Sequence, residues 1–337
     1  MEPLVSICIP VYNGASYLNA CLDSIFAQTF TNYELLIVDD GSSDESITLL
    51  SEAQKRFPKL RVHHNEKNLG LVGNWNRCLE LAQGTWIKFV FQDDLLAPDC
   101  LSQLMMAAAD SQALIVCQRH FLIEEDAPED LRQYFTKEVL TLEKIYNGQV
   151  PGFIPARQIA QLAVRYITRN FIGEPTTVLF KRALVSRLGN FDPNLAQICD
   201  LEYWLRIATH YGLKYVPEPL CTFRVHGSSA TTSNTRGKQF ISLFSDPTIL
   251  ASRLINAEVF NPFRHAISYL QSRKLHTYFG LKRYEAGMFL KANPEEASSR
   301  GALLLQKNTA FRPGETSSFW TQLVFRVVYW KRKRSKG

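Results

Sequence analysis

The sequence lacks the features that mark several large classes of protein. No run approaches the roughly 18 to 20 apolar residues of a membrane-spanning helix, the seven cysteines form no CxxC pair, and the formal net charge is only +6. We therefore expect no disulfide framework, no zinc site and no nucleic-acid-binding surface. An odd set of scattered cysteines favours a reducing compartment, so we expect a cytoplasmic protein that begins with a strand instead of a signal peptide.

The first third of the chain alternates strand and helix signals. Strands are predicted at residues 4–9, 33–38, 60–64, 86–91 and 113–117, with helices near 17–26, 42–56, 78–82 and after Pro98. Ser42 and Glu45 predict a capping box for the second helix. Short connections between alternating elements are typical of an α/β fold, with a mostly parallel sheet flanked by helices.

The remainder is less regular. Residues 119–155 are acidic and predict a surface excursion that covers the site. Beyond them we expect a helix at 156–169, a strand at 177–180, a helix at 200–210, and strands at 213–216 and 222–225. Helical patterns dominate after 237. We therefore expect one domain at 1–236, with halves 1–118 and 119–236, and a helical C-terminal region at 237–337.

Two predicted strands end in paired acids. The stretch LIVDDGSSDES carries Asp39 and Asp40, and WIKFVFQDD carries Asp93 and Asp94. Carboxyl ends of parallel strands are where ligands bind in such sheets. Asp40 suits a hydrogen bond from a base or ribose, although capping of the next helix would also explain it. Asp93 and Asp94 suit Mg²⁺ or Mn²⁺, although they could simply precede a helix.

The order of these motifs resembles the family 2 glycosyltransferases with the GT-A fold. The similarity runs through VSICIPVYNGASYL, YELLIVDDGSSDES and NLGLVGNWNRC to GTWIKFVFQDD, and covers roughly residues 3–230. It implies inverting transfer of a sugar from a nucleotide diphosphate sugar to a saccharide or lipid-linked acceptor, in cell-surface polysaccharide or glycolipid synthesis. QDD stands at the family's metal motif, which implies Asp94 as a ligand of Mn²⁺ or Mg²⁺ and Asp93 as a donor contact.

Inverting transfer needs a base that removes the proton of the acceptor hydroxyl. The family's motif for this base matches residues 199–204, CDLEYW, with Asp200 at the base position. Cys199 departs from the acidic residue that usually precedes it. The same resemblance assigns Glu174, Glu202 and Trp204 to the acceptor side. An N-cap for the following helix is the plain alternative for Asp200, and a turn is the alternative for Glu174.

Further donor contacts follow from the same resemblance. In FRVHGSS, His226 matches a metal ligand and Arg224 a partner for phosphate. Pro10 and Tyr12 match positions that line the nucleobase, where a tyrosine ring can stack, and Asn76 matches a position that faces the donor. Helix packing would explain Asn76 almost as well, and most lone histidines are ordinary polar residues.

The C-terminal end combines an amphipathic stretch with a basic tail. Trp320, Leu323, Val324, Val327 and Val328 share one helical face, and basic residues follow from 331. Residues 319–336 therefore suit contact with an anionic membrane surface, which would make the protein peripheral to the membrane. A helix packed on the catalytic domain is the alternative.

Other functional classes fit less well. PVYNGAS lacks the GxGxxG cradle of a dinucleotide oxidoreductase, and no early glycine-rich loop followed by a basic residue indicates a nucleotidyltransferase. A non-catalytic sugar-nucleotide-binding or protein-interaction module on the same fold is the remaining alternative. The joint presence of Asp40, Asp94 and Asp200 favours an enzyme.

Overall fold

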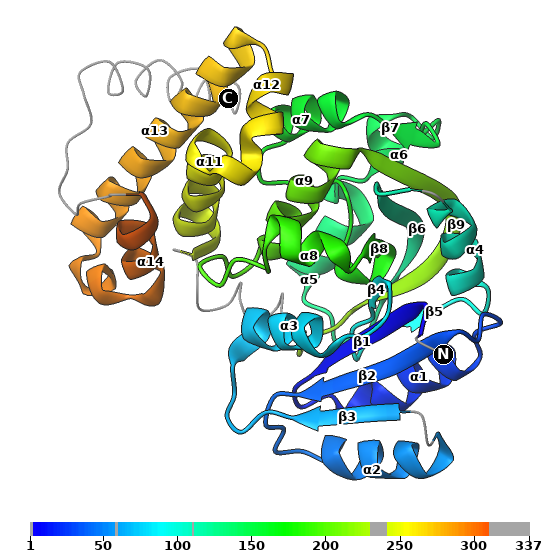
Figure 1. Ribbon diagram of the computed structural model, residues 1–337. Coiled ribbons are helices and arrows are strands. Elements are labelled where there is room, and N and C mark those ends of the chain that lie inside the picture. The colour runs from blue at the N-terminus through cyan, green and yellow to red at the C-terminus, as the bar shows by residue number, and fades with distance from the viewer. Residues whose placement is uncertain (1–2, 58–59, 110, 230–240, 310–337) are drawn as a thin grey trace.

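A mixed sheet with helices on both faces forms the centre of the molecule (Figure 1). The computed structural model describes residues 3–57, 60–109, 111–229 and 241–309. Within them the strand order is β3-β2-β1-β4-β8-β6-β9-β5, and β7 pairs with β9. The strands are β1 (Val5–Val11), β2 (Tyr33–Asp39), β3 (Leu60–His64), β4 (Trp86–Phe89), β5 (Leu95–Leu96), β6 (Leu114–Ile123), β7 (Phe153–Ile154), β8 (Val178–Lys181) and β9 (Leu213–Val225).

Two hydrophobic cores lie on opposite faces of the sheet. One contains residues of α1 (Ala15–Phe26), α2 (Ser46–Arg56) and α4 (Cys100–Ala108). The other contains residues of α3 (Gly70–Leu81), α7 (Ala156–Arg165), α8 (Ala183–Leu188) and α9 (Cys199–Tyr211). The short helices α5 (Glu129–Gln133) and α6 (Leu142–Ile145) lie in the connection between β6 and β7. This layering confirms the predicted α/β fold.

The sheet is mostly parallel, as predicted. β3, β2, β1 and β4 are mutually parallel and β6 is parallel to β9, whereas β8 is antiparallel to both β4 and β6. Strand β6 continues to Ile123 beside β9, so the predicted excursion begins later than residue 119. The two strands predicted at 213–216 and 222–225 are one strand. Pro217 and Pro219 resemble a turn in the sequence, yet they lie where the register with β6 shifts, a position that tolerates proline.

The predicted capping box is also wrong. Helix α2 begins at Ser46 after an N-cap residue, Glu45, whose side chain makes no capping hydrogen bond. Ser42 Oγ instead accepts a hydrogen bond from Asn13 N at 2.9 Å. The motif fails because a tertiary partner, the loop after β1, uses the hydroxyl.

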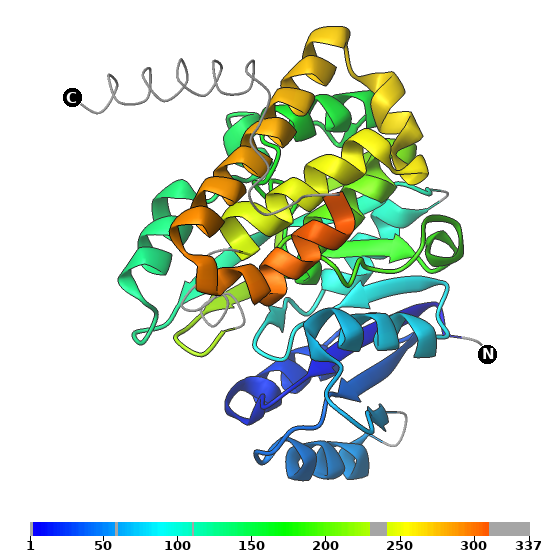
Figure 2. The ribbon, with the colours of Figure 1, turned by 90° about the vertical axis from the view of Figure 1, so that its left-hand side faces the viewer.

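The C-terminal helices pack on the catalytic part. They are α11 (Asp246–Asn256), α12 (Asn261–Ala266), α13 (Tyr269–Ala292) and α14 (Arg300–Thr309), and Figure 2 shows α11, α13 and α14 side by side. Ile249, Leu254, Phe263 and Leu275 belong to the same core as α7 and α9. The proposed boundary at 237 falls among residues 230–240, outside the described residues, and stays a prediction.

Candidate active site

A cleft opens where β1, β2, β4 and β9 end. Its volume is about 580 Å³. The predicted residues Pro10, Tyr12, Asp40, Asp93 and His226 all line it. Residues to which the sequence assigned no individual role line it as well, some of them within the predicted motifs: Val11, Asn13, Gly14, Ser16, Tyr17, Asn68, Gly70, Leu71, Asn74, Trp75, Phe91, Gln92, Ser228 and Ser229. The structure thus brings together residues from both halves of the predicted domain.

The loop between β1 and α1 forms one wall of the cleft. Asn13 has a φ of 48°, a left-handed conformation that asparagine tolerates better than most residues. The loop is held by side chains from the segment after β2: Asn13 N donates to Ser42 Oγ, Gly14 N to Ser46 Oγ and Ala15 N to Asp44 Oδ2, at 2.9, 2.9 and 3.0 Å. These hydrogen bonds fix the backbone that presents Tyr12.

Gln92 joins this loop to the acidic segment after β4. Its Oε1 accepts from Tyr12 N at 2.9 Å, and its Nε2 donates to Tyr12 O at 3.2 Å. A Cβ at Gly14 would lie 2.3 Å from Gln92 Oε1, so a larger residue there would displace the Gln92 side chain and break its hydrogen bonds to Tyr12. The ring of Tyr12 is 51% exposed and is therefore accessible to a ligand in the cleft.

Asp40 lines the cleft and also holds the start of α3. Its carboxylate accepts hydrogen bonds from Leu69 N at 2.8 Å, Gly70 N at 2.9 Å and Asn65 Nδ2 at 2.8 Å. A carboxylate at a helix N-terminus satisfies unpaired backbone donors and interacts favourably with the helix dipole. Asp40 therefore caps a helix, but the helix is α3 and not the next one along the chain.

Asp93 and Asp94 point in different directions. Asp94 is fully buried, and its carboxylate accepts hydrogen bonds from Thr176 Oγ1 and from Arg224 N. Burial, together with the charge on Asp93, raises the pKa of Asp94 well above its ordinary value. Asp93 faces the cleft instead, with its Oδ2 3.0 Å from Nε2 of His226. The structure does not bring Asp94 to the cleft, which corrects the order expected for this pair.

The predicted phosphate partner Arg224 lies beside the cleft and is already paired. It forms an ion pair with Glu124 and donates from Nε to Asp93 O at 2.9 Å. Its guanidinium carbon lies 4.9 Å from the ring centre of Tyr17, and that ring in turn lies 4.5 Å from the His226 ring. Arg224 therefore fixes the backbone of Asp93, and it is absent from the cleft lining.

Asp200 is a buried carboxyl at the start of α9. Its Oδ2 accepts from Asn170 Nδ2 at 2.8 Å, and its Oδ1 accepts from Leu201 N at 2.7 Å. Burial raises the pKa of Asp200 to about 7, and the nearby charge of Glu174 adds to the effect, whereas the Leu201 and Asn170 hydrogen bonds oppose it. A carboxyl with a pKa near neutrality is well matched to general base catalysis.

Residues 173–176 connect Asp200 to the cleft. Asn170 Nδ2, the donor to Asp200, also donates to Gly173 O at 3.0 Å, and Thr176 Oγ1 bonds to Asp94. The carboxyl of Asp200 is thus linked, through Asn170 and residues 173–176, to Asp94 in the segment after β4, although neither Asp200 nor Asp94 lines the cleft.

Several predicted residues are engaged elsewhere. Glu202 is buried in an ion pair with Arg206, which donates to it from Nε at 2.9 Å. Trp204 is buried and donates from Nε1 to Gly173 O at 3.1 Å, and Glu174 pairs with Arg119. Asn76 exchanges both hydrogen bonds with the backbone of Phe191, whereas Asn74 lines the cleft. The structure does not bring Asn76, Glu202 or Trp204 to the cleft.

Within the described residues, no group of three or more His, Cys, Asp or Glu side chains is arranged to hold a metal ion. None of the described helices combines the length and hydrophobicity that a bilayer span requires.

Comparison with known proteins identifies the family. The model for glycosyl transferase family 2 matches residues 6–174 of this chain. The chain belongs to this family. An uncharacterized protein from Mycobacterium tuberculosis is 32% identical to this glycosyltransferase over 232 residues, 68% of this chain and 70% of the relative. The putative glycosyltransferase EpsH from Bacillus subtilis is 33% identical over 156 residues, 45% of each chain.

Comparison with solved structures identifies the fold. The structure of Staphylococcus aureus TarS residues 1–349 in complex with UDP-GlcNAc matches this glycosyltransferase with a TM-score of 0.56 at 15% identity. The match covers 94% of this chain and 99% of that one. It shows that the two chains share the GT-A fold.

Proposed function

We propose that this protein transfers a sugar, with inversion, from a nucleotide diphosphate sugar to a hydroxyl group of an acceptor. One arrangement carries the proposal. The Asp93–His226 pair faces the cleft, and the segment 173–176 connects this region to a buried carboxyl, Asp200, whose pKa is close to neutrality. The residues proposed to bind the sugar donor and the proposed catalytic base are thus connected by one continuous set of contacts.

The cleft suits a nucleoside diphosphate. The related fold of TarS holds UDP-GlcNAc, and the exposed ring of Tyr12 offers a face on which a nucleobase can stack. Pro10 and Asp40 lie on the same wall. In this proposal the nucleobase stacks on the ring of Tyr12, and the diphosphate lies toward Asp93.

Asp93 and His226 fit a divalent cation. A carboxylate oxygen and an imidazole nitrogen 3.0 Å apart provide two ligands at the cleft surface. Mg²⁺ and Mn²⁺ are commonly held by one or two protein ligands together with substrate phosphates. Mn²⁺ or Mg²⁺ held there would stabilise the negative charge of the departing diphosphate. Asp94, the ligand expected from the sequence, is buried next to Asp93 and accepts hydrogen bonds from Thr176 Oγ1 and Arg224 N.

Asp200 is the proposed base. In its ionised form Oδ2 would accept the proton of the acceptor hydroxyl as the oxygen attacks the anomeric carbon, on the face opposite the leaving diphosphate. Asn170 Nδ2 and Leu201 N hold the carboxylate in one orientation. Glu174, Glu202 and Trp204 stay predictions for the acceptor side, with a structural role as the alternative that their contacts favour.

The acceptor that we propose is a saccharide or a lipid-linked sugar, in the synthesis of a surface polysaccharide or glycolipid. A cytoplasmic enzyme peripheral to the membrane fits this acceptor. Residues 319–336, predicted to contact the membrane, lie outside the described residues.

Ligand-induced stabilisation tests the proposal. We expect one of UDP, GDP and dTDP, with Mn²⁺, to raise the melting temperature, because a ligand that binds only the native state stabilises it. Donor sugars of that nucleotide should then be turned over. Binding without turnover of any donor and acceptor would support a non-catalytic module, and stabilisation by NAD alone would contradict the proposed function.

A further inference from the structure

Two segments that pack together contain no acidic residue. Residues 156–170 carry Arg157, Arg165 and Arg169, and residues 259–284 carry Arg264, Arg273, Lys274, Lys282 and Arg283, with no Asp or Glu in either segment. The chain as a whole is nearly balanced, with 38 Lys and Arg against 32 Asp and Glu. The charge is therefore concentrated locally, and helix α7 contacts both α12 and α13.

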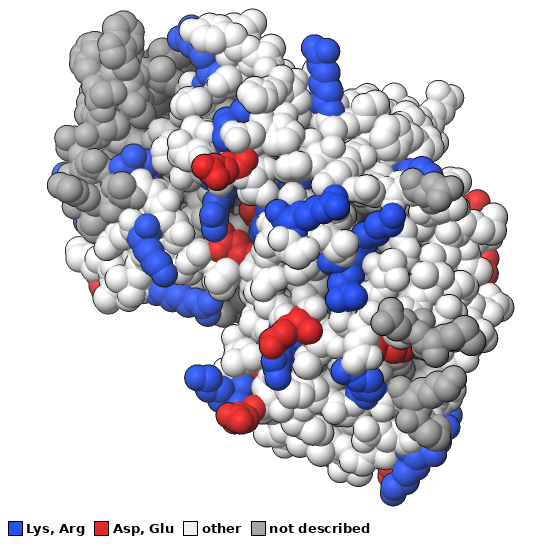
Figure 3. All heavy atoms as spheres, viewed as in Figure 1, with Lys and Arg blue, Asp and Glu red and all other residues white. Residues whose placement is uncertain are grey.

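Figure 3 shows Lys and Arg side chains projecting from the upper end of the molecule, which carries α7, α12 and the start of α13. Arg157, Arg165, Arg169, Arg273 and Lys274 are all exposed. We call these five residues the basic face. No Asp or Glu from α7, α12 or the first half of α13 neutralises it.

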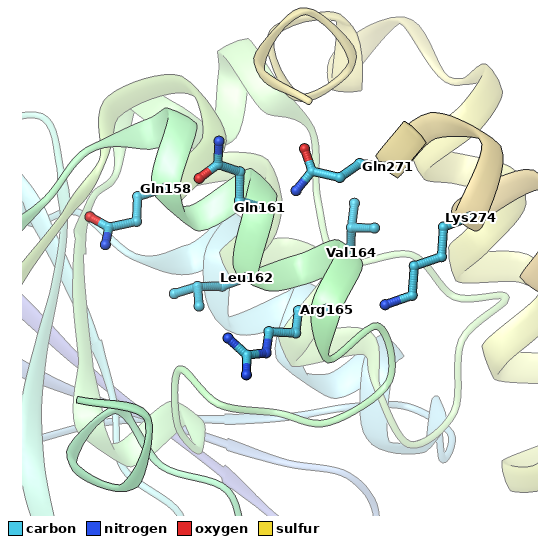
Figure 4. Close-up of a pocket in the computed structure, with 7 residues that line it drawn as sticks. All are labelled: Gln158, Gln161, Leu162, Val164, Arg165, Gln271 and Lys274. Carbon is cyan, nitrogen blue, oxygen red and sulfur yellow. The ribbon is translucent and has the colours of Figure 1, made fainter. Parts of the chain in front are cut away.

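An open cavity of about 450 Å³ lies between α7 and α13 within this face (Figure 4). It is lined by three amide side chains, of Gln158, Gln161 and Gln271, by two cationic ones, of Arg165 and Lys274, and by the apolar side chains of Leu162 and Val164. Amides and cations together can bind the oxygens of a phosphate group and the hydroxyl groups next to it.

Two apolar side chains stand beside the cations. Tyr269 and Leu270, the first residues of α13, are each 74% exposed. A capping box fixes them at the helix start: Ser268 N donates to Gln271 Oε1 at 2.9 Å, and Gln271 N donates to Ser268 Oγ at 3.3 Å. The Arg273 guanidinium carbon lies 5.9 Å from the centre of the Tyr269 ring.

We propose that the basic face binds the anionic headgroups of a lipid bilayer, with Tyr269 and Leu270 inserted at the interface and a headgroup phosphate in the α7–α13 cavity. Cations attract the negative surface potential of such a bilayer, and aromatic residues prefer the depth of the headgroups. A soluble polyanion would also bind the cations but would offer no apolar phase to Leu270.

Vesicle binding by the full-length protein, without any sugar donor, tests the proposal. We expect binding to vesicles of equal parts phosphatidylglycerol and phosphatidylcholine, and little binding to phosphatidylcholine alone. Arg165→Glu with Lys274→Glu should weaken binding by roughly thirtyfold or more, since each cation near the surface contributes about a factor of five. Tyr269→Ser with Leu270→Ser should weaken binding by roughly fivefold.

A matched control reverses the charge of Lys55 and Arg56, two exposed cations on α2 at the other end of the sheet. This variant should bind vesicles as the unmodified protein does. The proposal is overturned if the unmodified protein shows no preference for phosphatidylglycerol, if the control loses as much binding as the basic-face variant, or if Tyr269→Ser with Leu270→Ser has no effect. Because no donor is present, these outcomes leave the proposed transfer reaction untouched.

Discussion

Replacement of Asp200 by asparagine separates catalysis from folding and donor binding. The substitution keeps the shape of the side chain and an oxygen that can accept from Leu201 N, but removes the negative charge. Loss of a general base typically costs a factor of 10² to 10⁴ in rate, which is roughly 3 to 5 kcal/mol in the activation free energy. We expect kcat to fall in this range, and the nucleoside diphosphate to bind unchanged.

The pH profile should carry the signature of the same group. Only the ionised carboxylate can accept a proton, and burial raises the pKa of Asp200 to about 7. The rate of the unmodified enzyme should therefore rise with pH up to about 7 and then level off. In Asp200→Asn the residual rate should show no such rise, which initial-rate measurements over a pH series would reveal.

As the pH rises and Asp200 ionises, the stability of the folded protein should fall while its activity rises. A carboxyl whose folded-state pKa of about 7 lies above the ordinary aspartate value of 3.8 destabilises the folded state once it ionises. The cost is absent below pH 4, grows between pH 4 and 7, and reaches roughly 4 kcal/mol above pH 7, since each pKa unit corresponds to about 1.4 kcal/mol. Asp200→Asn should therefore melt at a higher temperature at pH 8, with no advantage near pH 4.

Activity, donor binding and melting temperature of Asp200→Asn together test the role of Asp200. An Asp200→Asn enzyme with full activity would remove Asp200 as the base. A variant that is inactive but has also lost donor binding would indicate a structural role, and a lower melting temperature at pH 8 would contradict the burial argument. Asn170→Ala is a useful companion because it removes a donor to Asp200 and should raise the pKa seen in the pH profile.

Three further substitutions test the rest of the site. Asp93→Ala should abolish the Mn²⁺ dependence of nucleoside diphosphate binding in a calorimetric titration, whereas Asp94→Asn should retain part of it; the reverse order would restore Asp94 as the metal ligand. Tyr12→Ala should weaken binding of the nucleoside diphosphate by roughly 1 kcal/mol, the value of an aromatic contact, and equal affinity would exclude stacking. Arg206→Leu leaves Glu202 buried without its partner and should lower the free energy of unfolding by roughly 3 to 5 kcal/mol in urea; a change below about 1 kcal/mol would contradict the buried pair.

Strong hydrophobic patterns explain why the first strands were predictable. β1 and β2 are almost entirely buried runs between polar loops, so residue type alone indicates them. The place of β8 was not predictable, because whether a short buried strand pairs in a parallel or antiparallel way depends on the path of the chain before it. The same holds for Pro217 and Pro219, which break most strands but here lie at an irregular register.

The residue types of the site were predictable from the sequence, but which side chains face the cleft was less so. Asp93 and Asp94 are adjacent in a turn, in which Asp94 N donates to Phe91 O at 3.0 Å. Only the path of the backbone through this turn determines which of the two side chains faces the cleft. Asn74 and Asn76 lie about 200° apart around a helix, so only one of them can face the cleft, and residue type alone does not tell which. Asn170, which donates a hydrogen bond to Asp200, belongs to no motif that could be identified in the sequence.

The acidic stretch after β2 shows how a recognition motif and a structural one can coincide. Two aspartates followed by hydroxyls suggest a ligand site, yet Ser42, Asp44 and Ser46 are each bonded to backbone N–H groups of the neighbouring loop. Asp40 bonds to the start of α3. These contacts leave few free donors or acceptors for a ligand. They hold in place, before any donor arrives, the two backbone segments that flank the cleft, which lowers the entropic cost of binding. Ser46→Ala should therefore weaken binding of the sugar donor, although Ser46 does not line the cleft.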